Sequence, residues 1–264
     1  MKHIASNAEP TDSGDDGTVP SKRFLISPLE AVLIVVGVYF VATFVGQFMV
    51  SVVPLFAGWS PQQVSTWLSS SPYAQFVYIL LVDAVTVGLL IFFIRARRVS
   101  LTAFGLIRPR IRDFGVTILA YPPYFVMNAA ATLAATWVFH LDINQRQQTG
   151  FENATSGMAL AVTFVSLVIL PPLIEEFVMR GFLFTSLKKG MDVKIAAVIT
   201  SVLFAVAHLQ LGNGVPALWL AALDTFILSL VLCYLRHKTG SLWAGIGLHM
   251  LKNGIAFAVL FVIH

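Results

Sequence analysis

Seven segments of the chain are apolar over about the length that a helix needs to cross a bilayer. A spanning helix takes about 20 predominantly apolar residues. The segments that meet this requirement are 28–54, 73–94, 114–139, 157–187, 194–210, 215–235 and 242–263. Pro171-Pro172 lies inside the fourth segment and predicts a kink or a break there, because proline lacks the backbone N–H. A broken fourth segment, or a short interfacial helix at 58–70, raises the count to eight. The pattern predicts an all-α, polytopic transmembrane helix bundle of about seven to eight helices.

Composition supports membrane residence. Hydrophobic residues make up 57% of the 264 residues and charged residues only 11%, whereas soluble domains carry about 25% charged residues. Residues 1–25 differ from the rest, because they are mostly polar and rich in turn-forming residues. Such a stretch cannot bury enough apolar surface to offset its conformational entropy. We therefore expect a disordered cytoplasmic tail at 1–25 and a single transmembrane domain at 26–264, with a motif-bearing core at about 157–264.

Loops that are rich in basic residues alternate along the chain with loops that have almost none. Fourteen basic residues lie on one side, and the other side holds only Arg146; the fourteen are Lys2, Lys22, Arg23, Arg95, Arg97, Arg98, Arg108, Arg110, Arg112, Lys188, Lys189, Lys194, Arg236 and Lys238. Because basic loops stay in the cytoplasm, the N-terminus is predicted to be cytoplasmic. This sorting explains the net charge of +4 by topology and lipid contact rather than by nucleic acid. We expect a multi-pass protein of the cytoplasmic membrane of a prokaryote.

Several ionisable side chains lie inside the apolar segments, where each costs about 2.5–3.5 kcal/mol on insertion scales. They are Asp83, Glu175, Glu176, Arg180, His208, Asp224, His249 and Lys252. Glu176 and Arg180 are spaced i, i+4 and so share a helix face, which predicts a structural salt bridge. Glu175 is rotated by about 100° from Glu176 and lacks that partner, so we assign it the chemical role.

Three of these side chains are predicted to lie at a common depth. At about 1.5 Å per helical residue, the distances from the nearest basic anchors are roughly 20 Å for Glu175, 21 Å for His208 and 17 Å for His249. Asn253 shares a helix face with His249. Asp83 and Asp224 fall near the same depth, and we interpret them as interhelical hydrogen-bond partners. Lys252 is placed to neutralise one of these two aspartates.

A carboxylate with two imidazoles supports hydrolysis in two ways. In the first, Glu175 is a general base for water, His208 holds that water, and His249 with Asn253 stabilises the oxyanion. In the second, Glu175, His208 and His249 bind a divalent metal such as zinc that activates the water. The chain contains no HExxH motif, and no serine or cysteine has a paired base at a recognisable spacing. Both alternatives remain open at this stage.

Three motifs resemble those of a known family. Glu175-Glu176-Phe-Val-Met-Arg180, Phe204-Ala-Val-Ala-His208 and His249-Met-Leu-Lys-Asn253, the last preceded by Gly240-Ser-Leu-Trp243, occur in order. They resemble the EExxxR, FxxxH and HxxxN motifs of the CAAX protease and bacteriocin-processing family of intramembrane peptidases. The resemblance implies catalytic roles for Glu175, Glu176, His208, His249 and Asn253, with Arg180 paired to Glu176. It also implies a peptide or protein substrate at the membrane, cleaved by CAAX-type processing or similar chemistry.

Two other classes of function stay open. One is a non-proteolytic membrane scaffold or immunity-type protein that carries the same motifs. The other is a proton-coupled transporter, since Asp83, Asp224 and the histidines are residues of the kind that relay protons in membranes. The sequence contains no evident internal repeat of the transporter kind, so intramembrane peptide hydrolysis is the favoured hypothesis.

Overall fold

The computed structural model describes residues 26–143, 149–209 and 217–263, and all regular elements in these ranges are helical. The predicted disordered tail at 1–25 lies outside the described residues. The helices are α1 (Pro28–Phe56), α2 (Pro61–Ser70), α3 (Pro72–Ala96), α4 (Ile111–Phe139), α5 (Gly157–Phe164), α6 (Leu170–Glu176), α7 (Phe184–Gly190), α8 (Val193–Ala207), α9 (Trp219–Thr239) and α10 (Trp243–Phe261). A 3₁₀ turn covers Leu101–Phe104, and π-helical turns cover Val165–Ile169 and Phe177–Leu183.

Six helical stretches in the described chain are long and apolar enough to cross a membrane. They are α1, α3, α4, the continuous stretch Gly157–Gly190, α9 and α10. The fifth expected span, 194–210, corresponds to α8, which is apolar but has only 15 residues. The short helix expected at 58–70 is present as α2. The chain is therefore an integral, multi-pass, all-α membrane protein, as the apolar pattern predicts.

The first three helices all begin at a Ser-Pro dipeptide: Ser27-Pro28, Ser60-Pro61 and Ser71-Pro72. In each case the serine side chain accepts a hydrogen bond from a backbone N–H of the first turn. Proline suits the first helical position because its missing N–H would have no partner there and its φ is already helical. These local signals set where α1, α2 and α3 begin.

The expected break at Pro171-Pro172 does not occur. Residues Gly157–Gly190 form one continuous helical stretch of 34 residues, which widens into the π-helical turn Val165–Ile169 just before the two prolines. Such local π adjustments let a transmembrane helix tolerate proline, provided that another group satisfies the freed carbonyls. Of the two predicted alternatives, a kink or a break, the break into two pieces is therefore wrong, and the π-helical turn accommodates the prolines within one continuous helical stretch.

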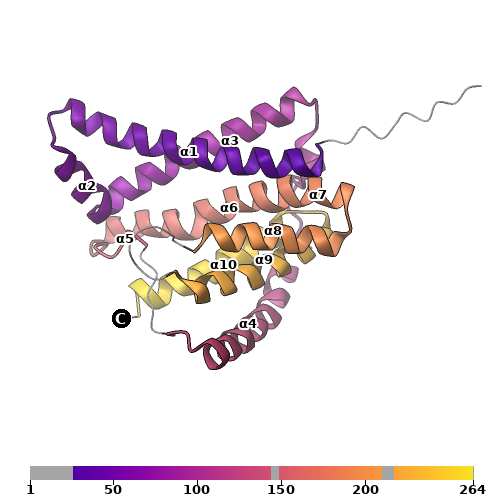
Figure 1. Ribbon diagram of the computed structural model, residues 1–264. Helices are drawn as coiled ribbons and strands as arrows, with labels where there is room; N and C mark the ends of the chain where they lie inside the picture. Colours follow the sequence, from indigo (N-terminus) through magenta and orange to yellow (C-terminus); the bar gives the residue numbers. More distant parts are fainter. Residues whose placement is uncertain (1–25, 144–148, 210–216, 264) are drawn as a thin grey trace, which may run out of the picture.

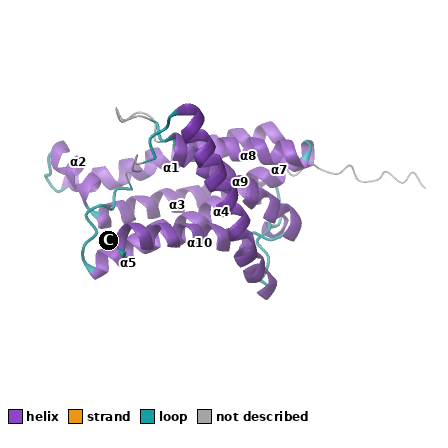
Figure 2. Ribbon diagram, turned by 90° about the horizontal axis from the view of Figure 1, so that it is seen from below, coloured by secondary structure: helices purple, strands orange, loops and turns teal. Residues whose placement is uncertain are grey.

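The helices form layers, shown in Figure 1. In that view α1 and α3 pack together at the top, the stretch from α5 to α7 lies beneath them with α8, and α9 and α10 lie below. Helix α4 covers the opposite side, and Figure 2 shows it crossing the layer that contains α9 and α10, against both of which it packs. The two glutamates of the first motif thus lie in a central element, enclosed by helices on both sides.

The loop between α3 and α4 is anchored by motif residues. Gly181 leaves room for the backbone, since a Cβ there would lie 3.2 Å from the carbonyl oxygen of Phe104. Gly105 has φ +88°, and a Cβ there would overlap the guanidinium of Arg236. The indole N–H of Trp243 donates to the carbonyl of Ile107 at 2.5 Å. The glycine after Arg180 and the Gly-Ser-Leu-Trp lead-in therefore hold this loop against the start of α10.

At the other end of the bundle, the segment before α5 is ordered by Glu152. Its carboxylate accepts hydrogen bonds from the backbone N–H groups of Thr149 at 2.7 Å and Gly150 at 3.3 Å. Burial alone would raise the pKa of Glu152, but the hydrogen bonds from backbone N–H groups outweigh it and hold that pKa below its ordinary value. Asn153 donates from Nδ2 to the carbonyl of Ser70 at 3.1 Å and ties this segment to the end of α2.

Candidate active site

The two adjacent glutamates of α6 have opposite surroundings. Glu176 is 1% exposed, and its Oε1 accepts a hydrogen bond at 2.8 Å from Nη1 of the fully buried Arg180, one turn along the same helical stretch. The side chain of Glu175 is 31% exposed, and its Oε2 has no hydrogen-bond partner among the described residues. Helical geometry alone predicts this division, because consecutive residues face about 100° apart.

His249 of α10 lies between the two carboxylates. Its Nδ1 is 3.2 Å from Glu176 Oε1 and its Nε2 is 3.9 Å from Glu175 Oε2. Glu176 is already paired with Arg180 and acts as an acceptor, so Nδ1 of His249 is the donor of this contact. The ring is therefore oriented by Glu176, with its other nitrogen directed at Glu175.

Phe204 of α8 packs against three of the polar side chains. The Arg180 guanidinium carbon lies 4.5 Å from the ring centroid. The rings of His208 and His249 meet it edge-on, with centroid distances of 4.6 and 6.1 Å. Such a cation–π contact stabilises a desolvated guanidinium. From the sequence, Phe204 was recognised only as the first residue of the FxxxH motif, and its packing role was missed. Its place in that motif was the one sequence feature that could have indicated the role.

His208 lies at the end of α8, where its Nδ1 donates to the carbonyl oxygen of Phe204 at 2.8 Å. A carbonyl can only accept, so this bond assigns the proton of the neutral ring to Nδ1 and leaves Nε2 as an acceptor. The ring is partly exposed. His208 can therefore accept a hydrogen bond from a water molecule next to the cluster.

Asn253 lies one turn after His249, and its Nδ2 donates to the carbonyl of Leu167 at 2.9 Å. That carbonyl would normally accept from residue 171 in an α-helix or from residue 172 in a π-helix. Both residues are prolines and have no N–H. The amide of Asn253 thus replaces the missing donor and joins α10 to the π-helical turn, so one of its N–H groups is already in use.

Lys252 confirms the expected neutralisation of an aspartate. Its Nζ forms an ion pair with Asp224 Oδ2 of α9 at 2.9 Å. The hydroxyl of Tyr124 in α4 donates to the other oxygen, Oδ1, at 2.5 Å, so Asp224 is also the expected interhelical hydrogen-bond partner. Asp83 differs: no described residue hydrogen-bonds its buried Oδ2, and it interacts electrostatically with Glu175 instead. The interpretation of Asp83 as an interhelical hydrogen-bond partner stays a prediction.

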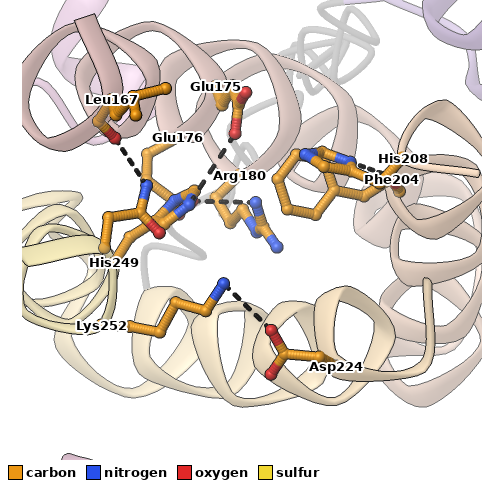
Figure 3. Close-up of polar contacts among 10 residues, drawn as sticks. Leu167, Glu175, Glu176, Arg180, Phe204, His208, Asp224, His249 and Lys252 are labelled. Atoms are coloured by element: carbon orange, nitrogen blue, oxygen red, sulfur yellow. Dashed lines mark hydrogen bonds and ion pairs between the residues drawn. The ribbon is translucent and has the colours of Figure 1, made fainter. Parts of the chain in front are cut away.

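Figure 3 shows how these side chains point toward one another from separate helices. The buried members are Glu176, Arg180 and His249, with side-chain exposures of 1%, 0% and 6%. The accessible members are Glu175, Lys252 and Asp224, at 31%, 28% and 20%, together with the partly exposed His208. The cluster therefore has a buried supporting layer and an accessible face, which is the arrangement that a reacting molecule requires.

The metal alternative can be tested on the same geometry. Among the described residues there is no group of three or more His, Cys, Asp and Glu side chains placed to hold a metal ion. Glu175, His208 and His249 do not come together as such a ligand set among these residues. Lys252 also interacts electrostatically with Glu175 and His208, which disfavours a nearby cation. The residues do not fit a divalent metal such as zinc.

Comparison with known proteins identifies the motif-bearing part of the chain. Residues 157–255 match the family model described as type II CAAX prenyl endopeptidase Rce1-like. This range includes Glu175, Glu176, His208, His249 and Asn253. No curated protein and no solved structure matches the chain. The motif-bearing part of the chain, residues 157–255, is therefore similar to the Rce1-like type II CAAX prenyl endopeptidases.

Proposed function

We propose that this protein is an intramembrane endopeptidase that hydrolyses a peptide bond of a membrane-associated protein or peptide with a water activated by Glu175. One observation carries the proposal. The side chain of Glu175 is partly exposed, but its Oε2 is buried without a hydrogen-bond partner among the described residues. This oxygen lies 3.9 Å from Nε2 of a buried histidine, which Glu176 and Arg180 hold in place. A general base of this kind must be reachable by substrate, and its partner must be fixed in orientation.

Charge balance supports a proton held within the cluster. Its contacting side chains supply three carboxylates (Glu175, Glu176 and Asp224) but only two permanent cations (Arg180 and Lys252). A net charge is costly in a low-dielectric environment. One additional proton balances the set, and the contact between Glu175 Oε2 and His249 Nε2 is the place where it can be shared.

The reaction then follows from the positions of the donors and acceptors. Water bound between Glu175 and Nε2 of His208 loses a proton to Glu175 as its oxygen attacks the peptide carbonyl carbon. The carbonyl oxygen becomes an oxyanion, which the N–H on His249 Nε2 stabilises. Glu175 returns the proton to the leaving nitrogen as the C–N bond breaks, giving a carboxylic acid and an amine. Glu176 and Arg180 take no part in proton transfer and keep His249 oriented.

The family description directs the choice of a first substrate. We propose a prenylated peptide with a C-terminal CAAX sequence, processed at the membrane. Fourteen basic residues on one side of the predicted spans support a cytoplasmic N-terminus and residence in the cytoplasmic membrane of a prokaryote. No metal-dependent step is required, because the carboxylate and the imidazoles suffice for the proposed chemistry.

The deciding experiment compares wild type with Glu175→Gln in proteoliposomes that contain a fluorogenic farnesylated CAAX peptide. Loss of the general base is expected to lower kcat by about 10²–10⁴-fold. Glu30→Gln is the matched control, because Glu30, in the first turn of α1, pairs with Arg97 and not with a residue of the cluster. Equal turnover by wild type and Glu175→Gln would contradict the proposal. Binding of the peptide by both proteins without any cleavage would instead favour the non-proteolytic scaffold or immunity-type function.

A further inference from the structure

A second polar cluster lies beside the motif residues and is not part of any motif. It consists of Tyr124, Asp224 and Lys252, joined by the 2.5 Å hydrogen bond from the tyrosine hydroxyl and the 2.9 Å ion pair. The three side chains come from α4, α9 and α10. Tyr124 also lies outside the segment that matches the family model. Ionisable groups within membrane spans are rare and call for a reason.

The ammonium of Lys252 is directed toward the reacting face. Lys252 follows His249 by three positions and so shares its side of α10. It interacts electrostatically with both Glu175 and His208. Figure 3 shows its Nζ reaching into the space around which Arg180, His208, Asp224 and His249 are arranged. We expect a purely structural ion pair within a membrane span to be fully buried. Both members of this pair are partly accessible.

The inventory of donors shows what Lys252 can supply. Asn253 already uses one N–H on the carbonyl of Leu167, and Arg180 is fully buried behind Glu176. An ammonium carries three N–H donors, and Asp224 is its one ion-pair partner among the described residues. At least two donors of Lys252 therefore remain for an acceptor on the accessible face.

Asp224 and Tyr124 are arranged so that the ammonium is held without being fully neutralised. The carboxylate holds Nζ of Lys252 in place, while the hydroxyl of Tyr124 donates to the other carboxylate oxygen. A hydrogen bond to an ionised acceptor draws on its negative charge. The ammonium can consequently respond to a second negative charge that develops nearby.

We propose that Lys252 is a catalytic residue that donates to the carbonyl oxygen of the scissile peptide as it becomes negative, and that Asp224 and Tyr124 are its positioning residues. This role rests on the proposed peptidase function. Lys252 and His249 then stabilise one oxyanion from adjacent turns of α10, while Asn253 braces α10 against the π-helical turn. Preorganised donors of this kind act on the transition state rather than on the bound substrate.

The test uses the full-length protein in proteoliposomes and the farnesylated CAAX peptide. Lys252→Met is expected to lower kcat by about 10²–10³-fold with little change in KM, because the interaction forms only in the transition state. Lys252→Arg, which retains a cation, should recover part of the loss. Asp224→Asn should lower kcat less than Lys252→Met does, and Tyr124→Phe should lower it less than Asp224→Asn does. Lys194→Met, at the exposed start of α8, is the matched control with unchanged kcat.

A second measurement separates a catalytic role from a structural one. A phosphinate analogue of the peptide carries a tetrahedral anion, whereas a ketomethylene analogue mimics the uncleaved substrate. Lys252→Met should weaken binding of the phosphinate by about the factor lost in kcat and leave ketomethylene binding unchanged. A Lys252→Met protein with lower thermal stability but wild-type kcat would overturn this inference alone. A wild type that cleaves nothing would overturn the proposed function and this role of Lys252 together.

Discussion

The buried pair Glu176–Arg180 offers a prediction in which stability and activity change in different ways. In Arg180→Met, the Glu176 carboxylate stays buried at 1% exposure and loses its 2.8 Å ion-pair partner. Removal of one member of a buried pair costs about 3–5 kcal/mol. Loss of the cation–π contact with Phe204 adds about 0.5–2 kcal/mol. The single variant should therefore be strongly destabilised.

The double variant Glu176→Met/Arg180→Met removes both charges and keeps similar side-chain volumes. Two costs remain: the unpaired Nδ1–H of His249, about 1–3 kcal/mol for a buried donor, and the lost cation–π contact with Phe204, which Arg180→Met alone also loses. The double variant should consequently be more stable than Arg180→Met alone. It should still lack activity, because nothing then orients His249 toward Glu175.

Thermal unfolding in one detergent, followed by the far-ultraviolet circular dichroism of the helices, measures the first effect. At about 2–4 °C of Tm per kcal/mol, Arg180→Met should unfold roughly 7–28 °C below wild type. Turnover of the farnesylated peptide per folded molecule measures the second effect. The reasoning fails if the double variant is as unstable as Arg180→Met, or if it cleaves the peptide at the wild-type rate.

Three further predictions concern supporting contacts. Asn253→Ala leaves the carbonyl of Leu167 without a donor and should cost about 1–3 kcal/mol; an unchanged Tm would show that this bond contributes nothing. Gly247→Ala places a Cβ 2.4 Å from Thr117 Oγ1, so its Tm should fall and should recover when Thr117→Ala is added, whereas no recovery would contradict the contact. The depressed pKa of Glu152 means that its stabilising effect is complete above the unfolded-state pKa and is lost as pH falls through the lower folded-state pKa. The hydrogen-exchange protection factors of the amides at 149–156, which correct for the intrinsic pH dependence of exchange, should therefore fall at low pH in wild type, and a Glu152→Gln protein should lack this fall.

Local spacing was sufficient for most features that depend on one helix. The apolar segments identify the spans because a bilayer leaves few alternatives to a continuous helix. The i, i+4 spacing of Glu176 and Arg180 predicts their ion pair, and the 100° rotation places Glu175 apart from it. Two consecutive prolines also imply that the carbonyl of Leu167 needs another donor, although sequence reasoning drew from them a break that the π-helical turn avoids.

Contacts between helices were decided only by the tertiary structure. The sequence offers Lys252 two aspartates as partners, but helix packing brings it to Asp224, whereas Asp83 interacts electrostatically with Glu175. Likewise, His249 meets Glu176, 73 residues away, because α10 packs on α6. Helical periodicity fixes the direction of a side chain on its own helix, whereas the rotation and height of one helix against another depend on side-chain packing along their whole contact. For that reason the sequence alone could name the charged and polar residues of this membrane protein, and only the packed bundle could divide them into a buried support and an accessible site.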